Sequence, residues 1–240
     1  MTPGKTAPIS RRERPAKPAL SLEGIVATAL GIMRAEGLER VTMRRLAQEL
    51  DTGPASLYVY VGNTAELRAY MLDELLGGLD LSPVTAPGDW RERLVTVLWS
   101  YGSALMEYPG LAQSALVTRP AGPGYLRMVD GLLALLAEGV PEDRTAWAVD
   151  LLLHFVTATA TEQGTRKVAD DARREESDLT AAILAATPRT FPRIAALGMD
   201  LVSGTGEQRL GWAFDVLLNG ILETPRPEGS QDVPGADGAP

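Results

Sequence analysis

The chain has 240 residues, a formal net charge of −8, no cysteine and one histidine, His154. This composition excludes disulfides and thiolate metal sites, and one histidine cannot form a histidine-rich metal centre. No apolar run approaches the roughly 18 residues of a membrane-spanning helix, and the basic start of the chain leads into no apolar stretch typical of a secretory signal. We therefore expect a cytoplasmic protein without a metal, a cofactor or a membrane partner.

The charge is distributed unevenly along the chain. Residues 1–70 carry ten Lys or Arg and seven Asp or Glu, a net charge of +3, whereas residues 71–240 carry a net −11. A mildly basic N-terminal part followed by an acidic remainder is the pattern expected if only the N-terminal part contacts phosphate groups. Charge alone does not distinguish this interpretation from chance variation.

Both ends of the chain lack the composition of a core. Residues 1–19 hold four prolines and five Lys or Arg, and such a segment cannot bury enough apolar surface to fold, so we expect a disordered basic arm. Residues 223–240 combine proline with Gly, Ser and Asp and predict a disordered acidic tail.

Between these ends we expect an all-α fold, because Ala and Leu dominate and the alternating pattern of a half-buried strand is scarce. Four helices near the N-terminus each have residues suited to begin them: Ser21, Thr42, Pro54, and Asn63 with Glu66 three residues on. Gly37 can end the first helix. The expected helices are 22–36, 43–50, 54–60 and 64–77.

Gly77-Gly78 and the segment from Pro83 to Gly88 mark a domain boundary. Beyond it, proline residues punctuate a second series of helices: 89–107, 109–116, 123–138, 142–167, 170–186, 189–198 and 206–222. We expect a domain over 20–66, a connecting helix over 64–77, and a larger helical domain over 78–222.

Residues 42–60 predict a helix-turn-helix, two short helices joined by a sharp turn at Asp51-Thr52-Gly53. Ala47 is small enough for the helices to cross closely, and leucines at 46, 50 and 57 can bury the shared core. The second helix can then lie in the major groove of DNA, which admits one helix. Arg44 can reach a guanine edge from the preceding helix, because its fork matches two acceptors there.

The segment from Leu22 to Leu76 resembles the DNA-binding domain of the TetR family of regulators. The resemblance is carried by the run 42–47, Thr-Met-Arg-Arg-Leu-Ala, and by 56–67, Ser-Leu-Tyr-Val-Tyr-Val-Gly-Asn-Thr-Ala-Glu-Leu. Thr64 stands where the family often has a phosphate-binding Lys, and Gly53 where a side chain often meets a base. The DNA-contacting residues that the motif and the resemblance imply are Thr42, Arg44, Arg45, Gly53, Pro54, Ala55, Ser56, Tyr58, Val59, Tyr60 and Thr64.

The resemblance extends to the regulatory domain of the tetracycline repressor subfamily, through Trp90, Thr118-Arg119-Pro120, His154-Phe155 and Glu162-Gln163. Three polar positions that this subfamily uses for drug and metal fall on Val97, Ala115 and Gly131, which implies a more apolar effector and no metal–drug complex. Aromatic and Met side chains could line its pocket or be plain core, and His154 could contact the effector or serve structure. The candidate effector residues are Val97, Tyr101, Ala115, Thr118, Met128, Gly131, Trp147, His154 and Phe155.

Helices 142–167 and 206–222 carry apolar residues on more than one face. Burial in the core explains this, and so does a four-helix interface between two subunits. The resemblance favours the second explanation and implies a homodimer that binds double-stranded DNA at a palindromic operator and is released by a small-molecule effector. The alternatives are an enzyme, for which no P-loop, nucleophile elbow or dinucleotide-binding turn is found, and a protein-binding module that retains the helix-turn-helix.

Overall fold

The structure is a computed structural model that describes residues 19–117, 120–168 and 172–227. Every regular element among these residues is a helix, which confirms the expected all-α class. The chain forms two compact units, one up to Thr64 and one from Ala65 onward. The predicted arm over 1–19 and tail over 223–240 lie almost wholly outside the described residues.

The first unit contains α1 (Leu22–Glu36), α2 (Met43–Glu49) and α3 (Pro54–Leu57), with a 3₁₀ turn, η2 (Leu38–Arg40), that was not predicted. The expected caps are present, because the hydroxyl of Ser21 accepts from the amide of Gly24 and that of Thr42 from the amide of Arg45, each at 3.1 Å. Apolar side chains from all three helices form the core: Ile25, Ala29, Leu30, Leu46, Ala47 and Leu57.

The third helix is shorter than expected. The prediction was 54–60, but α3 ends at Leu57 and residues 58–60 form a turn. The amides of Tyr60 and Val61 both donate to the carbonyl of Leu57, at 3.0 Å each. Val61 is buried, which explains why the chain turns inward here rather than continuing the helix.

The second unit is an assembly of helices whose bounds agree with the prediction within three residues at each end. They are α4 (Thr64–Gly77), α5 (Trp90–Glu107), α6 (Pro109–Val117), α7 (Pro123–Leu136), α8 (Glu142–Val168), α9 (Ala172–Leu184), α10 (Pro192–Leu197) and α11 (Gly206–Glu223). Two further 3₁₀ segments, η3 (Ser82–Val84) and η4 (Gly198–Val202), were not predicted. None of the helices described is long and apolar enough to cross a membrane.

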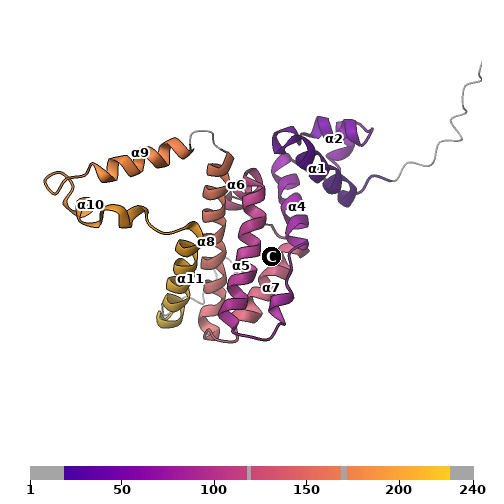
Figure 1. The fold of residues 1–240 in the computed structure, drawn as a ribbon. Helices are drawn as coiled ribbons and strands as arrows, with labels where there is room; N and C mark the ends of the chain where they lie inside the picture. The colour runs from indigo at the N-terminus through magenta and orange to yellow at the C-terminus, as the bar shows by residue number, and fades with distance from the viewer. Residues whose placement is uncertain (1–18, 118–119, 169–171, 228–240) are drawn as a thin grey trace, which may run out of the picture. The chain divides into compact units, whose positions relative to one another are not determined.

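The helices α5 and α8 run side by side at the centre of this unit, with α7 and α11 beside them (Figure 1). Their facing side chains form one continuous core: Leu94, Leu98, Leu105, Leu132, Leu135, Leu152, Val156, Phe214 and Leu218. Gly139 lies against the indole of Trp90, where any side chain would collide with the ring. These contacts hold α5, α7, α8 and α11 in place. The pockets of this unit form around these helices.

The chain after α11 corrects one prediction. A disordered tail was expected from residue 223, yet Glu223 is the last residue of α11 and the next residues return to α8. The guanidinium of Arg226 lies 4.4 Å from the ring centre of Trp147 and donates to the carbonyl of Asp143 at 2.8 Å. A cation over an aromatic face is attracted to it, and this contact orders the first part of the predicted tail.

Candidate DNA-binding surface and effector cavity

In the turn–helix segment 53–60, most side chains are exposed and one, Leu57, is buried and anchors the segment to the core. Leu57 has no exposed surface, whereas the residues on either side of it are exposed, Val59 to 80%. Tyr58, Val59 and Tyr60 are three consecutive exposed large side chains, and a group of this kind is typical of a contact surface. The predicted base-contacting residues Pro54, Ala55, Ser56 and Tyr58 share this exposed surface.

The two neighbouring arginines of α2 have different environments. The Arg45 guanidinium donates to both carboxylate oxygens of Glu36, at 2.6 and 3.3 Å, and to Glu49 at 2.7 Å. The hydrogen bond from Arg45 holds the pKa of the Glu36 carboxyl below its ordinary value. A DNA contact by Arg45, as predicted, would therefore compete with the ion pairs that join α1 to α2.

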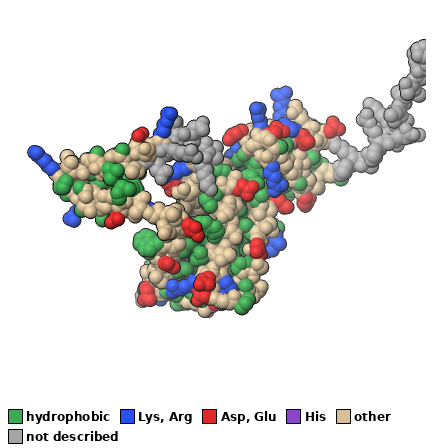
Figure 2. All heavy atoms as spheres, viewed as in Figure 1, with side chains coloured by type: hydrophobic (Ala, Val, Ile, Leu, Met, Phe, Trp, Pro, Cys, Tyr) green, Lys and Arg blue, Asp and Glu red, His purple; other side chains and the backbone are tan. Residues whose placement is uncertain are grey.

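Arg44 is exposed, and no acidic side chain among the described residues pairs with it. Figure 2 shows Lys and Arg side chains projecting from the first unit with Asp and Glu beside them, so the surface is not uniformly basic. A free guanidinium next to the turn–helix segment is suited to an acceptor edge or a phosphate.

The hydroxyl of Tyr60, a candidate DNA contact, is already hydrogen-bonded within the first unit. It donates to the carbonyl of Leu20 at 2.8 Å and so ties the chain before α1 to the end of α3. A phenol has one proton, so this hydroxyl cannot donate to a phosphate at the same time. The other hydroxyl-bearing candidates for DNA contact, Thr42, Ser56, Tyr58 and Thr64, are all exposed, and Thr42 already caps α2.

The turn between α2 and α3, predicted at Asp51-Thr52-Gly53, depends on the backbone conformation of Asp51. Asp51 has φ of 47°, a left-handed conformation that Asp tolerates better than most side chains. Gly53 has an ordinary φ of −81°, and a Cβ added to it would meet nothing within 4 Å. The backbone therefore does not require glycine at 53.

The candidate effector residues do not form one site. Val97 and Met128 are fully buried in the core, and a Cβ on Gly131 would come within 2.9 Å of Val84. These three are packing residues in this structure, and their contact with an effector stays a prediction. Thr118 lies outside the described residues. The other five line three separate hollows of the second unit.

The first hollow is a small cavity of about 50 Å³ among α5, α6, α7 and α8. Tyr101, Ala115 and His154 line it as predicted, and so do five residues that were not predicted: Leu116, Pro120, Tyr125, Leu153 and Thr157. The hydroxyls of Tyr101 and Thr157 are 2.7 Å apart, and Thr157 donates to the carbonyl of Leu153, so Tyr101 donates to Thr157. Thr157 could have been found from the sequence, because it lies one turn after His154.

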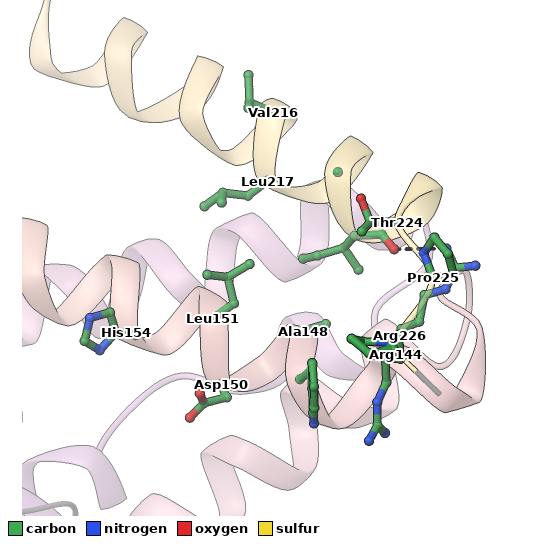
Figure 3. A pocket seen from close by; sticks show the side chains of 14 residues that line it. Arg144, Ala148, Asp150, Leu151, His154, Val216, Leu217, Thr224, Pro225 and Arg226 are labelled. Atoms are coloured by element: carbon green, nitrogen blue, oxygen red, sulfur yellow. Dashed lines mark hydrogen bonds between the residues drawn. The ribbon is translucent and has the colours of Figure 1, made fainter. Parts of the chain in front are cut away.

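The second hollow is an open groove of about 990 Å³ between α8 and α11. Figure 3 shows Leu151 of α8 and Leu217 of α11 between the helices, His154 at one end and Arg144 and Arg226 at the other. Large apolar side chains lie exposed on the two helices, with Leu151 at 44%, Val216 at 48% and Trp212 at 70%. His154 is also exposed, so it is not a buried structural histidine in this chain.

The third hollow, of about 410 Å³, lies between α5, α8 and the first turns of α11. Phe155 lines it and packs edge-to-face on Phe214, with ring centres 5.9 Å apart. Phe155 thus contributes to the core and to a hollow, the two roles that the sequence left open. Among the described residues no group of three His, Asp or Glu is placed to hold a metal ion.

Comparisons with known proteins cover both units. The family model described as "Bacterial regulatory proteins, tetR family" matches residues 25–71, and "Tetracyclin repressor-like, C-terminal domain" matches residues 82–224. The HTH-type transcriptional repressor DrrR1 of Streptomyces coeruleorubidus is 28% identical over 220 residues, 88% of this chain and 80% of that protein.

Two solved structures are similar throughout. One, assigned as a transcription regulator from Streptomyces coelicor, is 55% identical and covers 88% of this chain and 98% of its own, with a TM-score of 0.73. The other is the Streptomyces coelicolor TetR family protein ActR in complex with actinorhodin, which is 33% identical and covers 85% of this chain and 96% of its own, with a TM-score of 0.76.

Proposed function

Because the chain belongs to the TetR family of bacterial regulatory proteins, we propose that it is a homodimeric transcriptional repressor whose operator affinity is lowered by a small-molecule effector. The observation that carries this proposal is the exposed turn–helix segment 53–60 supported by the buried Leu57. The role needs no catalytic chemistry, and we assign it none. A regulator that acts on bacterial DNA works in the cytoplasm, which is the location we propose.

On DNA, α3 lies in the major groove with Pro54, Ala55, Ser56 and Tyr58 toward the base edges. Arg44 reaches a guanine from α2, and Ser56 and Thr64 contact the backbone on either side of the groove. Arg45 and Tyr60 hold these elements in place through Glu36 and Leu20 rather than by touching DNA. Gly53 and Val59 approach the duplex without a polar side chain.

The dimer forms through the exposed apolar face of α8 and α11. Leu151, Trp212 and Val216 lie exposed together on these two helices, and such a group of large apolar side chains left in water is typical of an interaction surface. Two copies related by a two-fold axis would cover each other's faces and give a four-helix contact. The same symmetry requires an operator with two inverted half-sites.

The effector enters the cavity that Tyr101, His154 and Thr157 share. Apolar walls with a few polar groups suit a ligand that is largely apolar and carries one or two hydroxyl or carbonyl groups. The complex of ActR with actinorhodin makes actinorhodin the first compound to test as an effector. No metal is needed, because Ala115 and Gly131 offer no ligand atoms in their side chains.

Selection of bound sequences from a random duplex library tests the proposal. The full-length protein should enrich an inverted repeat whose half-sites are about one or more helical turns apart. Actinorhodin, added to the complex with the selected duplex, should then lower the affinity measured by fluorescence anisotropy. Enrichment of no common sequence, or of one without inverted symmetry, would contradict the proposed function.

A further inference from the structure

The helix α7 begins without a capping side chain of its own. Its N-cap position is Gly122, and Pro123 follows with no amide hydrogen. The next two amides, of Gly124 and Tyr125, donate to the two carboxylate oxygens of Asp73, at 3.2 and 2.8 Å. An N-cap side chain normally accepts from these two positions. Here the cap comes from the middle of α4, a different helix.

Two glycines make this contact possible. A Cβ on Gly122 would collide with the carboxylate of Asp73, and a Cβ on Gly124 with the main chain of Asp73 and of Gly77. A Ser or Asp at 122 could cap α7 in the usual way only if α4 moved aside. The start of α7 is therefore shaped to fit against α4.

The start of α7 is also a wall of the small cavity. Tyr125, whose amide donates to Asp73, lines the cavity together with Pro120, which precedes the helix. The cavity measures about 50 Å³, whereas pockets that hold drug-sized ligands measure about 300–1,000 Å³. A ligand can enter only if these walls move, and α7 is joined to Asp73.

We propose that Asp73 is the positioning residue that couples expansion of the small cavity to movement of α4. This proposal rests on the proposed function, because α4 begins at Thr64, directly after the helix-turn-helix. When the cavity opens, the first turn of α7 shifts, and the two hydrogen bonds draw the middle of α4 with it. Without the carboxylate, the same expansion stays local to α7.

Hydrogen exchange on the full-length dimer tests the coupling without an operator or a ligand. Ala115→Leu overfills the cavity and takes the place of a ligand. In the parent chain this substitution should raise exchange at the amides of both 122–128 and 64–77, by about fivefold or more. With Asp73→Ala, which leaves neither amide an acceptor, the rise should remain at 122–128 and fall below about twofold at 64–77.

Glu74→Ala is the matched control, because it removes a carboxylate from the next, exposed position of α4. It should leave the response of 64–77 to Ala115→Leu unchanged. Circular dichroism and the measured mass establish that each variant is a folded dimer. If Asp73→Ala does not fold, Gly122→Ala serves in its place, because it keeps the carboxylate but forces it away from α7, and it should weaken the same response.

A response of 64–77 that persists in Asp73→Ala, or that is absent from the parent chain, would overturn the proposal. The affinity for the selected operator separates this failure from failure of the proposed function. If Ala115→Leu weakens operator binding equally with and without Asp73, the chain is a regulator and the coupling runs elsewhere. If exchange shows the coupling but no operator is found, Asp73 holds its role and the DNA-binding assignment is wrong.

Discussion

The two units of the molecule place their functional residues in opposite ways. In the first, the candidate DNA-contacting residues lie within 23 consecutive positions, 42–64, and most are exposed on a support of buried leucines. In the second, residues from α5, α6, α7 and α8 meet around one small cavity, and large apolar side chains lie exposed on α8 and α11. A local motif can be identified in a sequence, whereas a cavity built from four helices depends on how those helices pack.

The largest expected effect tests whether the second unit depends on a partner chain. Leu151→Asp combined with Val216→Asp places two carboxylates in the proposed interface, where each loses its hydration without a partner. We expect light scattering to show a monomer. The operator affinity should fall by about 100-fold or more, because a single DNA-binding unit contacts only one half-site and loses the gain from binding both. Leu126→Asp, an exposed leucine on α7 outside the groove, is the control and should remain dimeric.

The support of the DNA surface is tested by a substitution in the core of the first unit. Leu46 is fully buried, and Leu46→Ala should destabilise this unit by about 2–5 kcal/mol through lost burial and a cavity. Val59→Ala, at an exposed position, should change stability by no more than about 0.5 kcal/mol. Urea unfolding followed by circular dichroism measures both, and equal values for the two variants would refute the division into support and surface.

The neighbouring residues Arg44 and Arg45 are expected to have different roles in the first unit, one in DNA binding and one in stability. Arg44→Ala should weaken operator binding by about 1–3 kcal/mol and relax base preference at one position of each half-site. Arg45→Ala should instead lower the melting temperature, because it breaks the contact with Glu36 and Glu49. Anisotropy titrations on the operator and on scrambled DNA separate these effects, and loss of base preference on Arg45→Ala alone would reverse the assignment.

The hydrogen bond inside the small cavity makes a smaller contribution. Tyr101→Phe removes the donor to Thr157, whose hydroxyl keeps its bond to the carbonyl of Leu153. The expected cost in stability is about 0.5–1.5 kcal/mol. Because the phenol is also one of the polar groups of the cavity and can turn its proton from Thr157 to a bound carbonyl, affinity for an effector with a carbonyl should fall more than the stability does. Calorimetry of the wild-type and variant proteins with actinorhodin compares the two losses.

The smallest effect is a pH dependence confined to the first unit. The pKa of Glu36 in the folded chain lies below its ordinary value of 4.5. Its stabilising contribution is therefore present above the ordinary pKa and is lost as the pH falls through the folded pKa. Melting curves between pH 7 and pH 3 should fall less steeply for Glu36→Gln than for the parent chain. Identical slopes would mean that Glu36 gains nothing from Arg45 on folding.

Most of the fold was predictable because its signals are local. Ser21 and Thr42 cap the helices that they were expected to cap, and proline begins α6, α7 and α10. The length of α3 was wrong because burial of Val61 turns the chain after Leu57. Caps supplied from another helix, such as Asp73 on α7, leave no local signal, since the two partners are 51 and 52 residues apart.

The effector residues were harder to predict for a related reason. Helical spacing shows which residues share a face, but Val97, Met128 and Tyr101 belong to inward faces that are equally apolar in sequence. Only packing shows that Tyr101 borders a cavity while Val97 and Met128 touch other side chains. The apolar face of α8 and α11 could be recognised in the sequence, because both helices carry more apolar residues than a single buried face requires. This signal does not depend on how the helices pack.

The open position at Gly53 has a consequence for how such a regulator can diverge. Its backbone has ordinary angles and an added Cβ would meet nothing within 4 Å, so we expect that replacement there would not disturb Leu57 or the turn at Asp51. A single codon change could thus supply a new polar group at the groove, and the protein could acquire a different target sequence while its folding stayed the same. Such a change is possible because the residues proposed to contact bases are separate from the buried residues that stabilise the first unit.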